Sequence, residues 1–374
     1  MRIEELHLRE IIDSRTKSTL EAEINSSYGK APSGASTGEH EARCHVPEHL
    51  EEIEKLLKNR FEGRDLTQNE FDEELREIDG SDDFSRLGAS AVASSFAFKQ
   101  ASGFDHGKQF PLPLSNVIGG GEHGGNTSIQ EFLVLPVEAQ SFPEALETNT
   151  RIYQELKENY SRKIKGINDE GALITSMDDE QTLRALKKVT EKHGARIGLD
   201  IAASEIYEDG KYRLNALGKV NSPEQHLEFV QKLIDEFNLV YVEDPFNEED
   251  FRNHARLDKK NPDVLVCGDD LFTTSRDRLQ EGIDNGSCNS LIIKPNQVGT
   301  VSDARETVEL AKKEDYTPVI SHRSGETCDS TISDLALEWN CPIIKAGIAD
   351  IRIAKLNKLM RLWDKQREPG LNQK

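Results

Sequence analysis

The sequence contains no uninterrupted apolar run long enough to cross a bilayer, and no charged and apolar leader pattern follows Met1. Its five cysteines are an odd number, are scattered along the chain, and include no Cys-x-x-Cys pair. That pattern excludes a disulfide framework and a cysteine-based zinc site. Low-complexity tracts are absent as well. Together these absences predict a cytoplasmic protein whose thiols are free.

Positive charge is also scarce relative to negative charge. Lys and Arg number 47 against 68 Asp and Glu, so the formal net charge is -21 at pH 7. A surface of that sign repels nucleic-acid phosphates and anionic lipid headgroups, and we therefore expect no nucleic-acid partner and no membrane partner. The length of 374 residues exceeds what one simple core usually holds, which favours two domains.

Residues 1–110 are predicted to form a separate α+β domain. Two strands are expected over 3–12 and 19–27, followed by helices over 48–61, 69–78 and 88–99. Prolines at two alternate positions within residues 109–114 predict a hinge, which places the second domain at 111–374. Inside the first domain, residues 31–42 carry two glycines and three hydroxyl side chains. This segment reads either as an ordinary surface loop or as a loop that approaches a phosphate or a metal ion.

From residue 196 to residue 345, short apolar runs each close with a charged residue, and helix-patterned segments separate them at roughly 25-residue intervals. A repeated order of strand, polar tip and helix is typical of parallel βα units. Eight such units close into a barrel whose strand tips meet at one rim, where the chemistry of this architecture occurs. We therefore expect an α/β barrel with these charged tips gathered at one rim: Asp200, Glu243, Asp269, Lys294, His322 with Arg323, and Lys345.

Lys294 shows why the set matters more than any single tip. A lone lysine after the apolar run 291–293 would be expected to extend its ammonium to the surface. Charged tips recur on both sides of it, however, and this recurrence favours a functional site. The next residue, Pro295, cannot donate to a sheet and predicts that the strand ends at the lysine.

A series of motifs in chain order resembles the enolase (phosphopyruvate hydratase) family. The motifs are Pro-Ser-Gly-Ala-Ser-Thr-Gly-Glu-His-Glu-Ala at 32–42, Gln130-Glu131-Phe132, Asp169-Glu170-Gly171, Gly198-Leu199-Asp200, Val-Glu-Asp-Pro-Phe at 242–246, Asp269-Asp270-Leu271, Lys294 with Asn-Gln-Val-Gly-Thr at 296–300, and Ser-His-Arg-Ser-Gly-Glu-Thr at 321–327. The resemblance implies a small N-terminal α+β domain over a modified eight-stranded, TIM-like α/β barrel. It also implies Mg²⁺-dependent, reversible dehydration of 2-phosphoglycerate to phosphoenolpyruvate in glycolysis and gluconeogenesis, and a homodimer.

The same resemblance assigns roles to individual residues. Asp200, Glu243 and Asp269 would hold a first Mg²⁺, while a second ion arriving with the phosphorylated substrate would bind Ser36. Lys294 would be the general base, its pKa lowered by the nearby cations, and Glu170 with Glu131 would form the acid side. The implied substrate-binding residues are His123, Gln130, His322, Arg323, Ser324 and Lys345. For His123 and Gln130 a purely structural role stays open.

Two other functions also stay open. One is a different metal-dependent dehydratase that abstracts an α-proton on the same kind of barrel, although it would not explain the Ser-His-Arg-Ser run at 321–324. The other is a catalytically weak enolase-like chain kept as a binding or scaffold protein. That alternative does not explain why charges that are costly to bury without a metal have been retained.

Asn168 and Ala172, where the family usually has glycines, predict a stiffer turn around Glu170.

Overall fold

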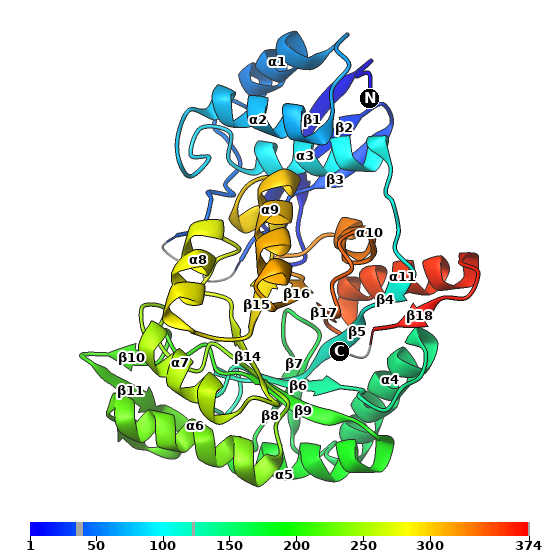
Figure 1. Ribbon diagram of the computed structural model, residues 1–374. Coiled ribbons are helices and arrows are strands. Elements are labelled where there is room, and N and C mark those ends of the chain that lie inside the picture. The colour runs from blue at the N-terminus through cyan, green and yellow to red at the C-terminus, as the bar shows by residue number, and fades with distance from the viewer. Residues whose placement is uncertain (35–39, 122–123, 373–374) are drawn as a thin grey trace.

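The computed structural model describes residues 1–34, 40–121 and 124–372. Its N-terminal part is a three-stranded antiparallel sheet covered by three helices, seen at the top of Figure 1. The strands are β1 (Leu6–Ile12), β2 (Ser18–Ile24) and β3 (Ser27–Lys30), and the helices are α1 (Leu50–Phe61), α2 (Gln68–Asp79) and α3 (Ala89–Ser102). The predicted α+β arrangement and its three helices are confirmed. The single strand expected over 19–27 was wrong at its end, because Asn25 and Ser26 take positive φ angles of 48° and 63° and turn the chain into β3.

Small residues let α3 lie unusually close to this sheet. A Cβ atom at Gly29 of β3 would come within 2.2 Å of the backbone nitrogen of Ala97, so only glycine fits there. The neighbouring α2 begins at a capping box in which Thr67 accepts from the Glu70 amide while the Glu70 carboxylate accepts from the Thr67 amide. The capping box fixes the start of α2, while amphipathic patterns made α1 and α2 predictable from the sequence.

Within the described residues, eight strands close into a barrel in the order β5–β6–β9–β13–β14–β15–β16–β17 and back to β5. The predicted fold class, a modified eight-stranded α/β barrel with a smaller N-terminal α+β domain, is confirmed. The strands are β5 (Leu112–Gly119), β6 (Glu131–Leu135), β9 (Arg196–Asp200), β13 (Tyr241–Glu243), β14 (Leu265–Gly268), β15 (Ser290–Ile293), β16 (Thr317–Ser321) and β17 (Ile343–Lys345).

One barrel strand runs against the others. β6 pairs antiparallel with both β5 and β9, whereas the remaining barrel pairs are parallel. The repeated order of strand and helix described for residues 196–345 does not extend to the earlier barrel strands, because β5 and β6 follow one another without an intervening helix. This reversal has a functional consequence, since the first residue of β6 lies at the rim where the parallel strands end.

Helices and short accessory strands surround the barrel (Figure 1). The helices are α4 (Phe142–Asn159), α5 (Asp179–Thr190), α6 (Pro223–Phe237), α7 (Phe251–Lys260), α8 (Arg276–Asn285), α9 (Val301–Lys313), α10 (Thr331–Glu338) and α11 (Ile353–Lys365). The accessory strands are β7 (Ile164–Ile167), β8 (Leu173–Thr175), β10 (Tyr207–Glu208), β11 (Lys211–Leu214) and β12 (Lys219–Asn221). The sheet β10–β12 fills the longest interval between charged tips, from Asp200 to Glu243. No helix in the described part of the chain has both the length and the apolar character needed to cross a membrane.

The segment 109–114 is structured on both sides of Pro111. β4 (Gln109–Phe110) pairs in parallel with β18 (Gly370–Leu371), and β5 begins at Leu112. Buried contacts also join the two parts of the chain, since Asp72 of α2 accepts from the Ser302 amide of α9 at 2.9 Å. The predicted hinge is thus a strand connection, while the domain limits 1–110 and 111–374 remain a prediction.

Alternation along the barrel strands explains why the charged tips point inward. The interior is filled by one buried cluster that includes Tyr241, Ile292 and Ile343. Each of these lies two positions before a charged residue, and side chains two positions apart lie on the same face of a strand. Glu243, Lys294 and Lys345 therefore continue the interior face beyond the apolar layer and reach the rim.

Candidate active site

Three carboxylates stand side by side across three neighbouring strands. Glu131 is in register with Asp200 in the β6–β9 pair, and Asp200 is in register with Glu243 in the β9–β13 pair. The antiparallel direction of β6 makes this possible, because its first residue meets the last residue of β9, which in turn pairs with the last residue of β13. All three residues are buried, with exposed fractions of 5% or less.

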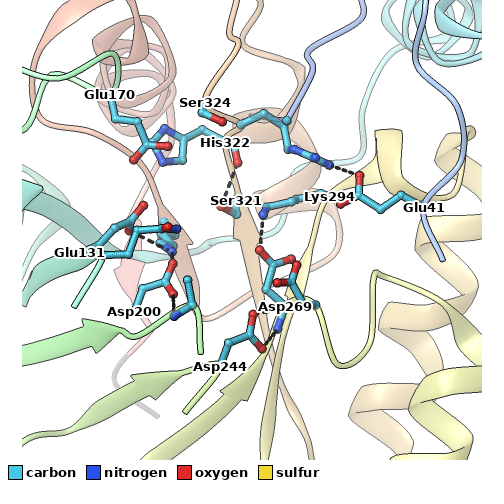
Figure 2. Close-up of a pocket in the computed structure, with 16 residues that line it drawn as sticks. Glu41, Glu131, Glu170, Asp200, Asp244, Asp269, Lys294, Ser321, His322 and Ser324 are labelled. Atoms are coloured by element: carbon cyan, nitrogen blue, oxygen red, sulfur yellow. Dashed lines mark hydrogen bonds and ion pairs between the residues drawn. The ribbon is translucent and has the colours of Figure 1, made fainter. Parts of the chain in front are cut away.

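The rim opens into one pocket, and Figure 2 shows the side chains that project into it. Of the residues predicted for the site, those that line this pocket are Gln130, Glu131, Glu170, Asp200, Asp269, Lys294, His322, Arg323, Ser324 and Lys345. Glu243 is fully buried and is not part of the lining, and it accepts from the Lys345 ammonium and, at 2.6 Å, from the Tyr241 hydroxyl. Ser36 and His123 lie outside the described residues.

Lys345 is the cation at the centre of the carboxylate row. Its Nζ lies 3.0 Å from Glu131, 2.9 Å from Asp200 and 2.8 Å from both Glu243 oxygens. Burial disfavours the charged ammonium, but the attraction of Asp200, Glu131 and Glu243 outweighs it and raises the pKa of Lys345 well above its usual range. Lys345 therefore stays protonated and holds the three acids together.

Glu131 and Glu170 form a carboxyl pair. Burial raises the pKa of Glu131 to about 8, Lys345 opposes that rise, and Glu170 and Asp200 add to it. Glu131 therefore carries a proton near neutral pH, as a carboxyl group that is to act as an acid must. Asn116 donates to Glu170 at 3.1 Å and fixes its orientation.

The turn that carries Glu170 is held by Asn168. The Asn168 Oδ1 accepts from the backbone amides of Glu170 at 3.0 Å and Ala172 at 2.8 Å. The turn ends at Gly171, whose φ of 81° suits glycine. The Asn168 side chain thus supplies two hydrogen bonds that hold this turn, while the stiffness expected from Asn168 and Ala172 stays a prediction.

Lys294 follows β15 directly, and Pro295 begins a short 3-10 helix, so the strand ends where the sequence predicted. The Lys294 ammonium donates to Asp269 Oδ2. Burial lowers the pKa of Lys294, but the Asp269 carboxylate outweighs burial, and the net shift is upward. In the protein alone, the raised pKa thus favours the charged ammonium of Lys294, whereas a general base must be neutral. The lowering expected from bound cations stays a prediction.

Asp244 and Asp270 extend the acidic cluster beyond the predicted set. Within the described part of the chain, carboxylate oxygens of Asp244, Asp269 and Asp270 all lie within 4.8 Å of one another. The Asp244 carboxylate accepts from the amides of Asp269 and Asp270, both at 2.9 Å. Asp244 therefore shapes the turn that carries Asp269. Burial, followed by the charge of Asp269, raises the pKa of Asp270 to about 8.

The run 321–324 at the end of β16 brings the His322 imidazole and the buried Arg323 guanidinium to another part of the pocket wall. Burial and the surrounding cations, Arg352 foremost, lower the pKa of His322 well below its usual range. Its Nδ1 finds no hydrogen-bond partner in the described part of the chain. Arg323 donates to Glu41 at 2.8 Å, and both side chains are nearly inaccessible. Arg352, which is fully buried, donates to the backbone oxygens of Arg323 and Ser324 and holds that run in place.

The N-terminal part of the chain contributes to the same wall. Ser33 forms an antiparallel bridge with Gly325, and the Ser14 amide donates to the Glu326 oxygen at 2.7 Å. Arg15 lies 3.3 Å from Asp169, next to Glu170. The first domain thus packs directly on the rim loops rather than standing apart from them.

Sequence reasoning named the motifs that contain Glu41, Asp244, Asp270 and Gln297 but gave these residues no role. All four are close to the rim: Glu41, Asp244 and Asp270 line the pocket, and Gln297 donates to Asp269 at 3.0 Å. Asn116 carries no signal in the sequence, because it lies inside a strand that has no charged tip. Only Glu41 offered a usable signal, as an acid within the polar loop 31–42.

Comparison with known proteins places this arrangement in a family. The model of the enolase C-terminal TIM barrel domain matches residues 107–370, and that of the enolase N-terminal domain matches residues 3–111. The chain belongs to the enolase family. An enolase of Natronomonas pharaonis is 44% identical over 395 aligned positions, covering 96% of this chain and 98% of the relative. Enolases of Archaeoglobus fulgidus and Halobacterium salinarum are 40% and 41% identical, and each comparison covers at least 97% of both chains. The predicted resemblance to the enolase family is confirmed.

Proposed function

We propose that this enolase-family chain is a hydro-lyase that catalyses the reversible dehydration of 2-phosphoglycerate to phosphoenolpyruvate. The observation that supports this most directly is the convergence of Lys294, the Glu131–Glu170 pair and Arg323 on one buried pocket that also holds the carboxylate row. The reaction needs a base, an acid, an anion-binding group and compensation for the negative charge that develops on the substrate. Relatives named enolase, alignable over nearly the whole chain, give the proposal independent support.

The donor set fits divalent cations. The pocket lining contains seven carboxyl groups, from Glu41, Glu131, Glu170, Asp200, Asp244, Asp269 and Asp270, against three basic side chains, Lys294, Arg323 and Lys345. Burial, followed by the charge of Asp200, raises the pKa of Glu243 well above its usual range despite Lys345, as expected where carboxyl groups outnumber basic side chains. Oxygen ligands are those that Mg²⁺ prefers. We assign one Mg²⁺ to Asp200, Glu243 and Asp269, and a second, arriving with substrate, to Ser36.

Bound Mg²⁺ would supply charge stabilisation for the developing substrate dianion. The chain's own groups handle the protons. Lys294 Nζ is assigned to take the proton from C2, which requires its ammonium to leave Asp269 and lose its proton first. Glu170, with the protonated Glu131 beside it, is assigned to donate to the departing C3 hydroxyl. Because Lys294 follows β15 while Glu170 follows β7, the two groups come from different sides of the pocket.

The remaining groups would hold the substrate. Arg323 and Ser324 are assigned to the phosphate, for which a guanidinium offers paired donors. Lys345 is assigned to the substrate carboxylate, and His322, Gln130 and His123 to positioning. Arg352 and Glu326 hold in place the run that contains the phosphate-binding residues Arg323 and Ser324. Glu326 does so by accepting from the Arg323 amide at 3.1 Å. A homodimer and a cytoplasmic location complete the proposal and rest on the resemblance and the composition.

A direct assay tests the proposal. Purified protein with Mg²⁺ should convert 2-phosphoglycerate into a product with the ultraviolet absorbance of phosphoenolpyruvate, and a chelator should abolish the signal. A phosphate-free acid sugar tested in parallel should give no product. Absence of turnover with 2-phosphoglycerate across a range of salt and Mg²⁺ concentrations would overturn the proposal in favour of a binding or scaffold role. Turnover of the acid sugar alone would indicate a different dehydratase.

A further inference from the structure

We propose that Thr274 is a positioning residue that acts through Gln297 to orient the base and the carboxylates of the pocket. The inference rests on the proposed function, because it concerns groups assigned to that reaction. Thr274 is fully buried in the turn between β14 and α8, and it does not line the pocket itself. It can therefore influence chemistry only through the groups that it contacts.

The Thr274 hydroxyl both accepts and donates a hydrogen bond. Its Oγ1 accepts from the backbone amide of Lys294 at 2.9 Å. It also donates to the side-chain oxygen of Gln297 at 2.6 Å, while the other available acceptor, the Ile292 oxygen, is 3.5 Å away. A hydroxyl has one proton to donate, and the shorter contact claims it. The backbone of Lys294 and the side-chain amide of Gln297 therefore both bind the same atom, Thr274 Oγ1.

This contact decides which way the Gln297 amide faces. With its oxygen turned to Thr274, its nitrogen faces Asp269 Oδ1 at 3.0 Å and Glu41 Oε1 at 3.3 Å. The opposite orientation would set an amide oxygen against two carboxylates and leave the Thr274 proton without a good acceptor. Gln297 is 1% exposed, so water cannot readily replace these partners.

The backbone at Thr274 supports a functional reason for the residue. Thr273 and Thr274 have φ angles of 46° and 57°, a region that branched side chains rarely adopt. The strained turn is held from α9, where the Thr307 hydroxyl donates to the Thr274 oxygen at 2.7 Å. Thr274 adopts an unfavourable backbone conformation, and its hydroxyl binds both Lys294 and Gln297. We infer that the hydroxyl is the reason for a threonine at this position.

The consequence is a chain of contacts that reaches three assigned groups. Thr274 sets the amide of Lys294, Gln297 sets the free oxygen of Asp269, and Gln297 also binds Glu41, whose other oxygen accepts from Arg323 at 2.8 Å. Two neutral side chains outside the pocket lining thus orient the base and the proposed metal ligand directly, and they reach Arg323 through Glu41. Loss of the hydroxyl should loosen all three together.

Thr274→Val tests this because it keeps the size and branching of the side chain and removes both hydrogen bonds. We expect kcat to fall about ten- to a hundredfold, the range expected for a small misplacement of reacting groups. Mn²⁺ affinity, measured by calorimetry without substrate, should fall by at least about tenfold because a carboxylate ligand loses its supporting donor. Thr274→Ser retains the hydroxyl and should recover most of both properties.

Thr182→Val is the matched control, because Thr182 is also fully buried but its hydroxyl has no hydrogen-bond partner among the described residues. It should leave kcat and Mn²⁺ affinity unchanged. If Thr274→Val fails to fold, Gln297→Met makes the same test without disturbing the strained turn. Wild-type kcat and Mn²⁺ affinity in Thr274→Val or Gln297→Met, or equal loss in the Ser and Val variants, would overturn the inference. An inactive wild type would instead refute the proposed function, and the Mn²⁺ measurement would still decide this one.

Discussion

Arg323 donates to the carboxylate of Glu41 at 2.8 Å, although the two residues are 282 positions apart in the chain. Their side chains are only 3% and 4% exposed, so the pair is effectively shut off from water. One partner comes from the N-terminal part of the chain and the other from the end of β16. The wall of the pocket assigned to phosphate therefore exists only when both parts of the chain are folded and packed together.

Glu41→Ala should destabilise the protein by about 3–5 kcal/mol, because it leaves a buried guanidinium without its partner. Inorganic phosphate should recover part of that loss if Arg323 can bind it. Urea unfolding with and without phosphate measures both effects. Exposed Glu48→Ala is the control and should change stability by no more than about 0.5 kcal/mol. A Glu41→Ala variant as stable as the wild type would show that water reaches Arg323 after all.

Lys345→Met should lower the melting temperature in chelator, because Glu131, Asp200 and Glu243 lose the ammonium that they share. Millimolar Mg²⁺ should raise the melting temperature of this variant more than that of the wild type, because the ion would then be the only positive charge next to these three carboxyl groups. Differential scanning calorimetry in both buffers provides the comparison. Exposed Lys313→Met should behave as the wild type does. Equal stability of Lys345→Met and wild type in chelator would contradict the prediction.

Lys294→Ala should reduce turnover by about 10²- to 10⁴-fold, the usual contribution of a general base. Mn²⁺ binding without substrate should be retained or strengthened, because Asp269 no longer has an ammonium competing for its oxygen. Stopped-flow absorbance and calorimetry measure the two quantities separately. Near-normal turnover would refute the base assignment alone, whereas lost Mn²⁺ binding would indicate that Lys294 mainly supports the structure.

Acidification should destabilise the protein through its buried histidines. Burial lowers the pKa of His226 and of His254 from 6.5 to about 4. Between about pH 6.5 and pH 4 the unfolded chain binds protons that the folded chain rejects, so stability falls as pH falls through that window. Each ring can contribute up to about 3 kcal/mol over the window.

His254→Phe removes one titrating ring and should flatten the pH dependence of the unfolding free energy, measured by urea titration at several pH values. His254 is the better choice for substitution because, among the described residues, its ring bonds only the Asp250 oxygen one turn earlier, whereas His226 bonds the distant Pro245 oxygen and stacks on Tyr212. Exposed His49→Phe is the control and should keep the wild-type slope. An unchanged slope in His254→Phe would mean that carboxyl groups dominate acid unfolding.

Local patterns account for the parts of the fold that were predictable. The runs before Asp200, Glu243 and Lys345 are short, apolar and closed by a charge, and parallel strands connected by helices bring their ends to one rim. The antiparallel β6 was missed because Glu131 stands at the start of its strand, so no apolar run precedes it as a signal. The same pattern gave no indication that β5 and β6 lack an intervening helix.

By itself, the sequence determined the class of fold, the family, and which charged residues the barrel would gather. Those properties follow from short apolar runs closed by a charge and from motifs of adjacent residues, both of which are local along the chain. Only the tertiary structure decided that Lys345 sits among three acids, that Lys294 binds Asp269, and that Glu41 closes on Arg323. Such pairings depend on register between strands and on packing between distant segments, and burial then sets the pKa of each group. No local pattern carries that information, because it arises when residues far apart in the chain are removed from water together.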